Sequence, residues 1–313
     1  MTALIVGCRG QDGKLLSDML RDKGYAVIGI DVGHVESHGI AYDTPIDISD
    51  AAAVHGLLDA ISFDEIYYFA AYHHSSEDEP IEPSVLIAES YRINVFGLVN
   101  FLDAMRRTKH SRMFYAASSL LYSSDTDSTQ KESSPCEPST VYGITKWDGR
   151  SLCRFYRNTC NVFASVGIFF NHESPYRGEK FISKKIVSAA VNIKRGEQDT
   201  LIVGDLNAAV DWGYAPDYVD AAWRILSLAK PDDFIIATGK THTVREFARI
   251  AFGHLGLSWE KHVREKADVV TRRRRAVAGN ASKLRRMTGW KPTVSFTEMV
   301  RILVEAQDEL IEK

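Results

Sequence analysis

The chain has 313 residues, and its 38 Lys and Arg side chains nearly balance 41 Asp and Glu side chains, for a formal net charge of -3. This balance excludes a general electrostatic attraction to nucleic acid or to an anionic membrane surface, and it favours small-molecule chemistry. The length exceeds that of a usual single core, so we expect one large α/β unit with a smaller lobe attached.

The cysteines and the amino-terminal sequence indicate the cellular compartment that we expect for the protein. The 4 cysteines include no Cys-x-x-Cys pair, and no Cys or His spacing is typical of a zinc site, so we expect reduced thiols and no metal. The amino terminus enters an apolar run directly, without the regions of a signal peptide, and no stretch has the ~18 apolar residues that a membrane span needs. We therefore expect a cytoplasmic protein that does not cross a membrane.

The first elements in chain order are a strand, a glycine-rich turn and a helix. The apolar run Ala3–Val6 precedes the turn, and the periodic segment Leu15–Leu20 follows it. Glycines in such a turn let the backbone bend sharply and approach a pyrophosphate, whose charge is held by the free N–H groups at the helix start. The pattern predicts a dinucleotide site formed by Gly7, Gly10, Gln11, Asp12 and Gly13.

A second apolar run, Tyr25–Ile30, ends in Asp31, about 20 residues after the glycine turn. A carboxylate at this place accepts hydrogen bonds from the 2′-hydroxyl of a ribose and repels a 2′-phosphate. Asp31 therefore favours NAD over NADP as the cofactor.

Strand and helix patterns alternate through the rest of the first half. We expect strands at Asp64–Ala71, Arg112–Ala117 and Val162–Ile168, helices at about Tyr91–Lys109 and Val141–Arg157, and a surface loop at Ser123–Thr140. This alternation is typical of an α/β fold with a doubly wound parallel sheet. From residue 171 on, Gly, Pro and charged residues interrupt shorter elements. We expect a dinucleotide-binding domain over residues 1–168 and a substrate lobe over residues 169–313, with segments of the lobe returning to the first domain.

Tyr142 and Lys146 lie four residues apart on a predicted helix, so both side chains leave the same face. An ammonium near a phenol stabilises the phenolate. We therefore expect Lys146 to lower the pKa of Tyr142 toward neutrality, making it a base for a sugar hydroxyl while hydride leaves the same carbon. Ser118 and Ser119 directly follow the strand ending at Ala117, at the edge where doubly wound sheets place their ligands. One hydroxyl there can hydrogen-bond the reacting oxygen.

Two adjacent histidines, His73 and His74, follow the strand that ends at Ala71, and this position borders the expected substrate site. Histidine titrates near neutral pH, so either ring is a candidate acid or base. A histidine pair at a strand end is also a common hydrogen-bonded structural feature, and the sequence leaves both alternatives open.

Together these residues resemble an extended short-chain dehydrogenase/reductase, and within that group the chain is similar to the GDP-mannose 4,6-dehydratase family. The similarity covers nearly the whole chain. Besides the glycine turn and the Ser118, Tyr142 and Lys146 set, it rests on six blocks: Tyr91–Gly97, Asn171–Phe181, Gly204–Ala208, Asp211–Ala215, Ala237–Gly239 and Thr243–Phe247.

The resemblance implies a Rossmann-type fold with a smaller C-terminal lobe, and a reaction on a nucleotide sugar. Family members oxidise the sugar at C4 with a tightly held nicotinamide, remove the C5 proton, lose water from C6 and return the hydride to C6. By position, the resemblance adds four cofactor contacts, Asp47, Ile48, Ala70 and Ala71. It also implies substrate contacts at His74, Ser119, Asn171, Glu173, Arg177, Lys180, Asp211, Trp212 and Arg275.

Three departures from the family pattern bear on the activity. The family's acid–base glutamate, two residues after the catalytic serine or threonine, is replaced by Leu120, which cannot move a proton. The arginine that usually precedes the Asp-Trp pair is replaced by Val210, which removes a planar cation suited to phosphate. The later Arg-Pro-x-Glu segment is replaced by Arg272–Arg275, which is either a substitute pyrophosphate contact or a solvated basic face.

These observations predict an NAD-dependent enzyme that transfers hydride at C4 of a GDP-linked sugar, such as a GDP-mannose-like sugar or GDP-heptose, and forms a 4-keto or 4-epimer product. The alternative is a 4,6-dehydratase that uses a base other than the missing glutamate, with Glu173 or His74 as candidates. A catalytically silent NAD-binding module is a third possibility, but it predicts damage to the Ser, Tyr and Lys set, which is intact. We expect the helices near residues 91 and 141 to carry apolar stripes on outward faces. The resemblance implies that these helices pair across a two-fold axis, so we expect a homodimer, with a tetramer left open.

Overall fold

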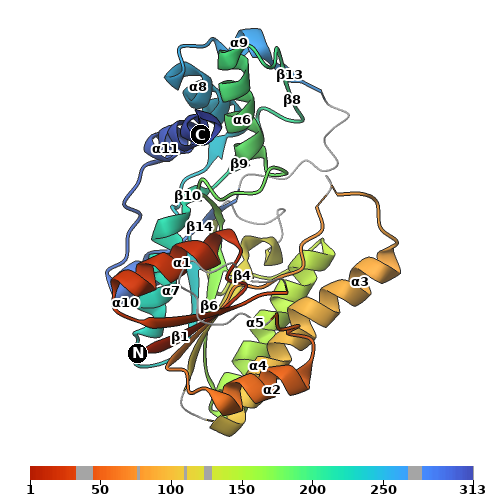
Figure 1. Cartoon of the computed structure of the whole chain (residues 1–313), viewed down its shortest axis with the longest axis vertical. Coiled ribbons are helices and arrows are strands. Elements are labelled where there is room, and N and C mark those ends of the chain that lie inside the picture. Colours follow the sequence, from red (N-terminus) through yellow and green to blue (C-terminus); the bar gives the residue numbers. More distant parts are fainter. Residues whose placement is uncertain (33–44, 76–77, 109–110, 123–128, 267–276, 313) are drawn as a thin grey trace.

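A six-stranded parallel sheet forms the centre of the molecule. The structure is a computed structural model, and it describes residues 1–32, 45–75, 78–108, 111–122, 129–266 and 277–312. Every neighbouring pair of strands in this sheet is parallel, in the order β11-β6-β4-β3-β1-β2. The strands are β1 (Thr2–Val6), β2 (Ala26–Ile30), β3 (Glu65–Tyr68), β4 (Arg112–Ser118), β6 (Phe163–Phe169) and β11 (Asp233–Ile236). The predicted doubly wound parallel sheet is confirmed (Figure 1).

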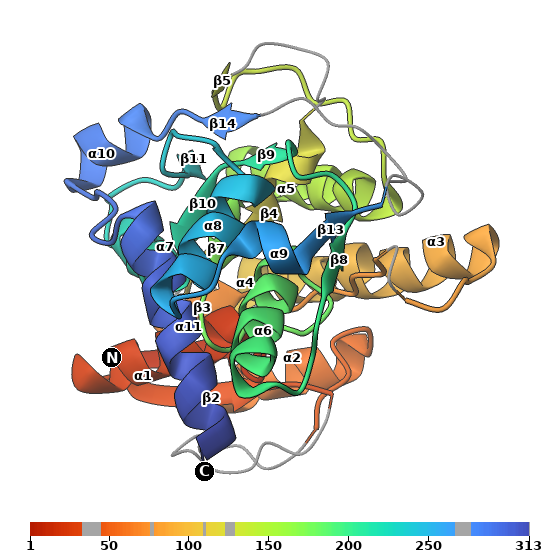
Figure 2. The same cartoon turned by 90° about the horizontal axis from the view of Figure 1, so that it is seen from above.

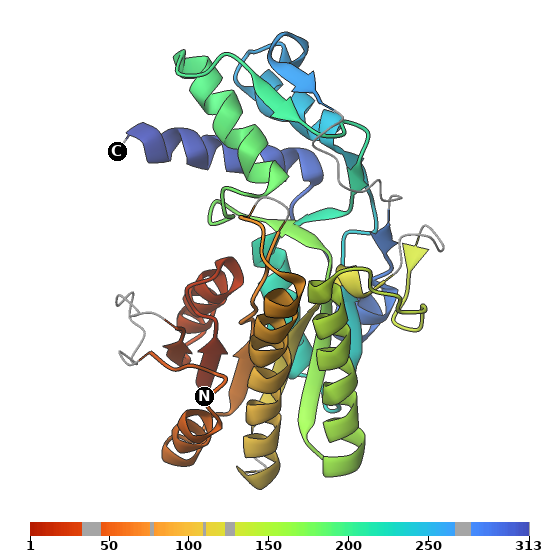
Figure 3. The same ribbon diagram turned by 90° about the vertical axis from the view of Figure 1, so that its right-hand side faces the viewer.

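Helices cover both faces of the sheet (Figure 1). On one side lie α1 (Gln11–Asp22), α7 (Ala215–Leu226) and α10 (Ser282–Thr288). On the other side lie α2 (Ala51–Ala60), α4 (Gly97–Thr108) and α5 (Val141–Cys160). Figure 3 shows α4 and α5 side by side on this second face.

The alternation of side chains along β1 explains how one strand serves two cores. Ala3 and Ile5 join the apolar cluster under α1 and α7, whereas Leu4 and Val6 join the cluster under α2 and α4, and all four are fully buried. A strand buried on both faces needs a continuous apolar run, as this one has. Each buried aliphatic side chain contributes about 1.5–3 kcal/mol to folding.

The helix expected at about Tyr91–Lys109 begins earlier than the sequence indicated. α3 (Pro83–Tyr91) leads through one π-helical turn (Arg92–Phe96) into α4 without a break. Proline suits the first turn of a helix because its missing N–H has no intrahelical partner there. The apolar side chains of α3 do not gather on one buried face, and Val85 and Ile87 are about half exposed, so the helical period that marks α4 is weak in α3.

By length and composition alone, the helical segment Pro83–Thr108 is apolar enough to cross a membrane. In the fold it packs against α2 and α5 beside the sheet. We therefore assign it to the helix layer of the domain.

A smaller lobe stands over the carboxyl ends of the strands, and Figures 1 and 2 show its helices grouped away from the sheet. Its own core joins residues of α6 (Ile182–Arg195), α8 (Val244–His254) and α11 (Phe296–Glu312). The remaining elements of the lobe are α9 (Trp259–His262) and the short strands β8 (Leu201–Val203), β9 (Ala209–Val210), β12 (His242–Thr243) and β13 (Val263–Glu265).

Several segments after residue 168 lie in or beside the first domain. β11 is an edge strand of the main sheet, and α7 and α10 cover one of its faces. β14 (Ala278–Gly279) pairs with β5 (Thr129–Gln130), so the stretch expected as a loop at Ser123–Thr140 contains a short strand. β7 (Asn171–Glu173) pairs with β10 (Trp212–Tyr214), and β7 lies next to the glycine turn that follows β1.

Candidate active site

The strand order places a cleft at the end of β1. β1 lies next to β3, and the connections that leave these two strands run in opposite directions, from β1 toward β2 and from β3 toward β4; open α/β sheets bind ligands at such a point. A cavity of about 1190 Å³ opens there. The predicted cofactor residues Gly7, Gly10, Asp31 and Ile48 line it, together with Ala70 and Ala71.

The glycine turn fits the close approach of a pyrophosphate. Gly7 has φ +88°, which favours glycine, and a Cβ on it would lie 2.7 Å from the backbone nitrogen of Ala70. A Cβ on Gly13 would collide with the carbonyl oxygen of Gly7 and with the Cα of Cys8. Side chains are therefore excluded from both positions, and the backbone N–H groups at the start of α1 stay accessible from the cavity side.

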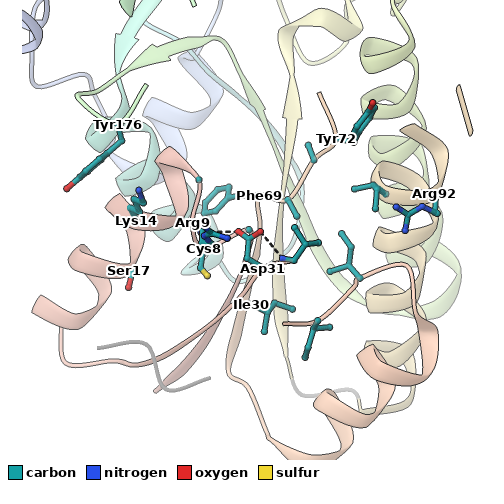
Figure 4. Close-up of a pocket in the computed structure, with 18 of the residues that line it drawn as sticks. Cys8, Arg9, Lys14, Ser17, Ile30, Asp31, Phe69, Tyr72, Arg92 and Tyr176 are labelled. Carbon is teal, nitrogen blue, oxygen red and sulfur yellow. Dashed lines mark hydrogen bonds between the residues drawn. The ribbon is translucent and has the colours of Figure 1, made fainter. Parts of the chain in front are cut away.

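Asp31 ends β2 and faces the same cavity (Figure 4). Its carboxylate accepts hydrogen bonds from the backbone N–H groups of Arg9 at 3.1 Å and Val32 at 2.9 Å. These bonds orient the carboxylate and leave lone pairs for the two hydroxyls of a ribose. Asp47, another predicted cofactor residue, does not line the cavity: its carboxylate binds Ser49 and Arg92, and these partners lower its pKa.

Several cavity-lining side chains were not predicted from the sequence, and three of them suit a phosphate-containing ligand. Arg9 lies within the glycine turn, Lys14 follows on α1, and Tyr176 comes from the segment after β7. Figure 4 shows Lys14 and Tyr176 together at one end, and the Lys14 Nζ atom lies 5.2 Å from the tyrosine ring centroid. Their charges and the aromatic face suit a phosphate-containing ligand. The sequence did not mark these three residues as site residues because Arg, Lys and Tyr are common at exposed positions.

Gln11 and Asp12, predicted to bind the cofactor, turn their side chains to the β7 segment. Gln11 donates to the carbonyl oxygen of His172 at 3.2 Å and accepts from the Ser174 hydroxyl at 2.9 Å. Both carboxylate oxygens of Asp12 lie 3.0–3.1 Å from His172 Nε2, while His172 Nδ1 lies 2.8 Å from the Phe170 carbonyl oxygen. Both imidazole nitrogens of His172 thus lie within hydrogen-bond distance of an oxygen atom, and the ring joins the start of α1 to β7.

The π-helical turn places a buried amide between two parts of the site. Asn94 accepts from the backbone N–H of Tyr72 at 2.7 Å and donates to the Tyr72 carbonyl oxygen and the Thr145 hydroxyl at 3.0 Å. It thereby ties the segment after β3 to the first turns of α5. Extra turns of this kind recur at functional sites because they redirect one side chain.

Tyr142 and Lys146 leave the same face of α5, as the spacing predicted, and lie near the carboxyl end of β4. The Lys146 Nζ atom is 5.6 Å from the Tyr142 ring centroid and donates to the Ala116 carbonyl oxygen at 2.7 Å. Burial raises the pKa of Tyr142 to about 12 and lowers the pKa of Lys146 to about 7. The expected lowering of the tyrosine pKa is therefore wrong for this structure: desolvation of the phenolate outweighs the opposing positive charge of Arg177.

Ser118 ends β4, and its hydroxyl accepts a hydrogen bond from the Leu120 N–H at 3.2 Å. Ser119 opens the short 3₁₀ turn Ser119–Leu121 that leads out of the strand. The backbone of this turn packs on α5, since a Cβ on Gly143 would lie 2.5 Å from the Leu120 carbonyl oxygen. Position 120 is thus held next to the helix that carries Tyr142, and its side chain has no group that transfers a proton.

The structure separates the two histidines after β3. His73 lies against the proposed base: its ring centroid is 4.7 Å from that of Tyr142. His74, the predicted substrate contact, has its Nε2 atom 3.0 Å from the Glu79 carbonyl oxygen. Lys180, another predicted contact, reaches from the segment after β7 to Asp78 at 2.9 Å.

Glu173 and Arg177, also predicted substrate contacts, bind each other. Glu173 is buried, accepts from the Ser183 hydroxyl at 2.6 Å, and its Oε2 atom lies 3.1 Å from the Arg177 Nε atom. The Arg177 guanidinium also lies 3.5 Å above the Phe181 ring. These contacts occupy the Glu173 carboxylate, which does not line the main cavity, so it is a weak candidate for the missing base.

The remaining predicted substrate contacts have other surroundings. Asp211 is buried and accepts four hydrogen bonds, from the N–H groups of Thr238, Gly239 and Gly279 and from the Thr238 hydroxyl. Trp212 packs in an aromatic group with Phe247 and Phe296. Neither side chain lines the main cavity, and both hold the lobe together. Asn171 begins β7 and is exposed, whereas Arg275 lies outside the described residues.

Comparison with known proteins agrees with this geometry. The family described as GDP-mannose 4,6 dehydratase matches residues 4–303. A curated relative, GDP-mannose 4,6 dehydratase 1 of Arabidopsis thaliana, is 35% identical over 331 residues, which cover 99% of this chain and 91% of the relative.

Solved structures show the same fold at lower sequence identity. The structure of RMD from Pseudomonas aeruginosa complexed with NADPH is 21% identical with a TM-score of 0.82, and covers 99% of this chain and 100% of that one. The dTDP-glucose 4,6-dehydratase of Bacillus anthracis in complex with NAD is 19% identical with a TM-score of 0.84, and covers 100% and 98%. The match over nearly the whole chain shows that this chain belongs to the GDP-mannose 4,6-dehydratase family.

Proposed function

We propose that this protein binds NAD and oxidises a GDP-linked sugar at C4, with release of a 4-keto product or return of hydride to give the 4-epimer. The observation that carries the proposal is the buried pair of Tyr142 and Lys146 beside a dinucleotide cleft, with Leu120 on the adjoining turn. Family membership supports the nucleotide-sugar substrate, and the names of the relatives support a GDP-linked one.

The cavity residues fit a dinucleotide. The Gly7 turn would hold the pyrophosphate and Asp31 the ribose, because the first excludes side chains and the second presents an oriented carboxylate. Asp31 favours NAD over NADP by charge repulsion of a 2′-phosphate. When bound, NAD supplies the two-electron acceptor for the C4 hydrogen.

The protein residues would act on the C4 hydroxyl. Tyr142 takes its proton, and the Ser118 hydroxyl orients the same oxygen. Lys146 lies beside the tyrosine, and when its amine is protonated, the positive charge stabilises the Tyr142 phenolate. Burial disfavours that phenolate in the structure, so the base becomes effective only as positive charge near it increases.

The fate of the 4-keto sugar depends on position 120. The family's reaction needs an acid–base group for the C5 proton and the C6 hydroxyl, and Leu120 has none. We therefore propose that water is not lost from C6. The second candidate is a 4,6-dehydratase with another base, which family membership favours.

Two measurements test the proposal. The nucleotide released from the purified protein by denaturation is expected to be NAD, and NADP as the main species would contradict the cofactor assignment. Mixing the NAD-loaded protein with GDP-mannose or a GDP-heptose in a single turnover is expected to raise the absorbance of reduced nicotinamide. A protein that binds NAD and gives no such signal with any GDP-sugar would favour a silent module.

We also propose that the protein is a cytoplasmic homodimer. Phe96 of the π-helical turn, with Trp147 and Phe155 of α5, exposes 40–58% of each residue's surface on the helix layer that faces the viewer in Figure 3. Large apolar side chains that cluster on adjacent helices are typical of a surface that pairs with another copy.

A further inference from the structure

His73 carries a buried nitrogen without a partner. Among the described residues, the His73 Nδ1 atom is shielded from solvent and makes no hydrogen bond. A buried polar atom without a partner costs about 1–3 kcal/mol. Such atoms are rare in folded proteins, and one on a ring that packs against the proposed base needs an explanation.

The ring is held firmly in the candidate site. Its centroid lies 4.7 Å from the Tyr142 ring, edge to face, and it stacks on Phe181 at 6.0 Å. The preceding residue, Tyr72, has both backbone groups bound by Asn94. A ring fixed in this way against the proposed base at C4 stands next to the neighbouring carbons of the same sugar.

The charges around His73 favour its neutral form. Among the described residues, the positive charges of Lys180, Arg177 and Lys146 lower its pKa, and the charge of Asp78 opposes them. Together with desolvation by burial, they lower its pKa to about 4. At neutral pH the ring therefore has a free lone pair, and its basicity is close to that of a glutamate, whose usual pKa is about 4.3.

We propose that His73 is the base that removes the proton from the carbon adjacent to the C4 carbonyl. The proposal rests on the proposed function, since that carbon becomes acidic only when C4 is a ketone. The C–H bond breaks, its proton goes to the neutral imidazole of His73, and its electron pair forms the enolate with the C4 oxygen. Return of a proton from the imidazolium to carbon completes the cycle, with no net oxidation or reduction.

This assignment gives the chain a group for one part of the work that Leu120 cannot do, the removal of the carbon-bound proton, and it leaves the C6 hydroxyl without an acid. The family's glutamate belongs to the turn after β4, whereas His73 belongs to the segment after β3. If the His73 imidazolium exchanges its proton with solvent before a proton returns to carbon, the sugar gains a solvent hydrogen at C3 or C5.

The test uses the NAD-loaded wild type and His73→Phe in deuterated water with GDP-mannose and a GDP-heptose. His73→Phe keeps a ring against Tyr142 and Phe181 but removes the nitrogen. We expect the wild type to reduce its NAD and to place deuterium at C3 or C5 of the recovered sugar, read by NMR and mass spectrometry. His73→Phe is expected to reduce its NAD within about threefold of wild type and to lose deuterium incorporation by about 10²- to 10⁴-fold.

A second readout does not depend on turnover. Because phenylalanine removes an unsatisfied buried polar atom, the melting temperature of His73→Phe is expected to equal or exceed that of wild type. The matched control is His55→Phe on α2, which removes another buried nitrogen without a partner, away from the cleft, and is expected to leave deuterium incorporation unchanged.

The outcomes separate the two proposals. Absence of nicotinamide reduction in wild type would overturn the proposed function. Nicotinamide reduction with deuterium incorporation that is absent in wild type, or unchanged in His73→Phe, would overturn the role of His73 alone. A clear fall in the melting temperature of His73→Phe would identify a structural role instead.

Discussion

At the scale of single residues, the chemistry of the site depends on one hydroxyl. Tyr142→Phe removes the proposed base and keeps the ring that packs on His73. We expect unchanged NAD content and sugar-nucleotide binding, with single-turnover nicotinamide reduction slower by about 10²- to 10⁴-fold. Reduction at the wild-type rate would show that another group takes the proton.

The buried lysine makes stability depend on pH. Lys146 has a pKa of about 7 in the fold, whereas an unfolded lysine titrates at about 10.4, so the unfolded chain binds more protons between these values. The contribution of Lys146 to the free energy of unfolding therefore rises with pH across that window. We expect the melting temperature of wild type to gain on that of Lys146→Met from pH 7 to pH 10. A constant difference would mean that the amine is not buried unprotonated.

At the scale of elements, the start of α1 is joined to β7 by the Asp12 and His172 pair. His172 and the hydrogen bond from Gln11 lower the pKa of Asp12 against the desolvation that raises it. The stabilisation is thus present above the usual pKa of an aspartate, about 3.9, and is lost as pH falls through the lowered value.

Asp12→Asn is expected to lower the free energy of unfolding by about 1–3 kcal/mol at pH 7, because it removes the carboxylate that contacts the buried His172 ring. Urea denaturation measures the change. Asp103→Asn, which removes an exposed pair with Arg106, is the control and should change stability by less than about 0.5 kcal/mol. Equal effects of the two substitutions would contradict the assigned pair.

At the scale of the whole molecule, the exposed apolar face of the helix layer has a consequence for assembly. Phe155→Asp places a charge on the surface that we propose to be covered by a second copy. Light scattering at micromolar concentration is expected to give a dimer for wild type and a monomer for the variant, with NAD content retained. A monomeric wild type would contradict the proposed homodimer.

The sequence predicted the fold and the family well because both depend on local patterns. Apolar runs and the spacing of glycines in the first turn marked the parallel sheet and its cleft, and both are confirmed. The family resemblance stated from motifs is also confirmed. The early start of α3 was missed because its apolar side chains follow no helical face.

Properties set by tertiary surroundings were not available from the sequence. Spacing placed Tyr142 and Lys146 together, but the direction of the tyrosine pKa depends on burial. Likewise, two neighbouring histidines are equivalent in sequence, and the fold binds one to a carbonyl oxygen while it leaves a nitrogen of His73 without a partner. The roles assigned to the site residues stay predictions until the variants are measured.

The most direct test of the proposed chemistry is the identity of the product from the NAD-loaded wild type with GDP-mannose and a GDP-heptose. Mass spectrometry and NMR distinguish the fates of the sugar. We predict a product that keeps the C6 oxygen, either two hydrogens lighter than the substrate as the 4-ketone or equal to it in mass as the 4-epimer. Stoichiometric loss of water to a 4-keto-6-deoxy sugar would contradict this prediction, because it requires the acid–base chemistry at C6 that Leu120 lacks.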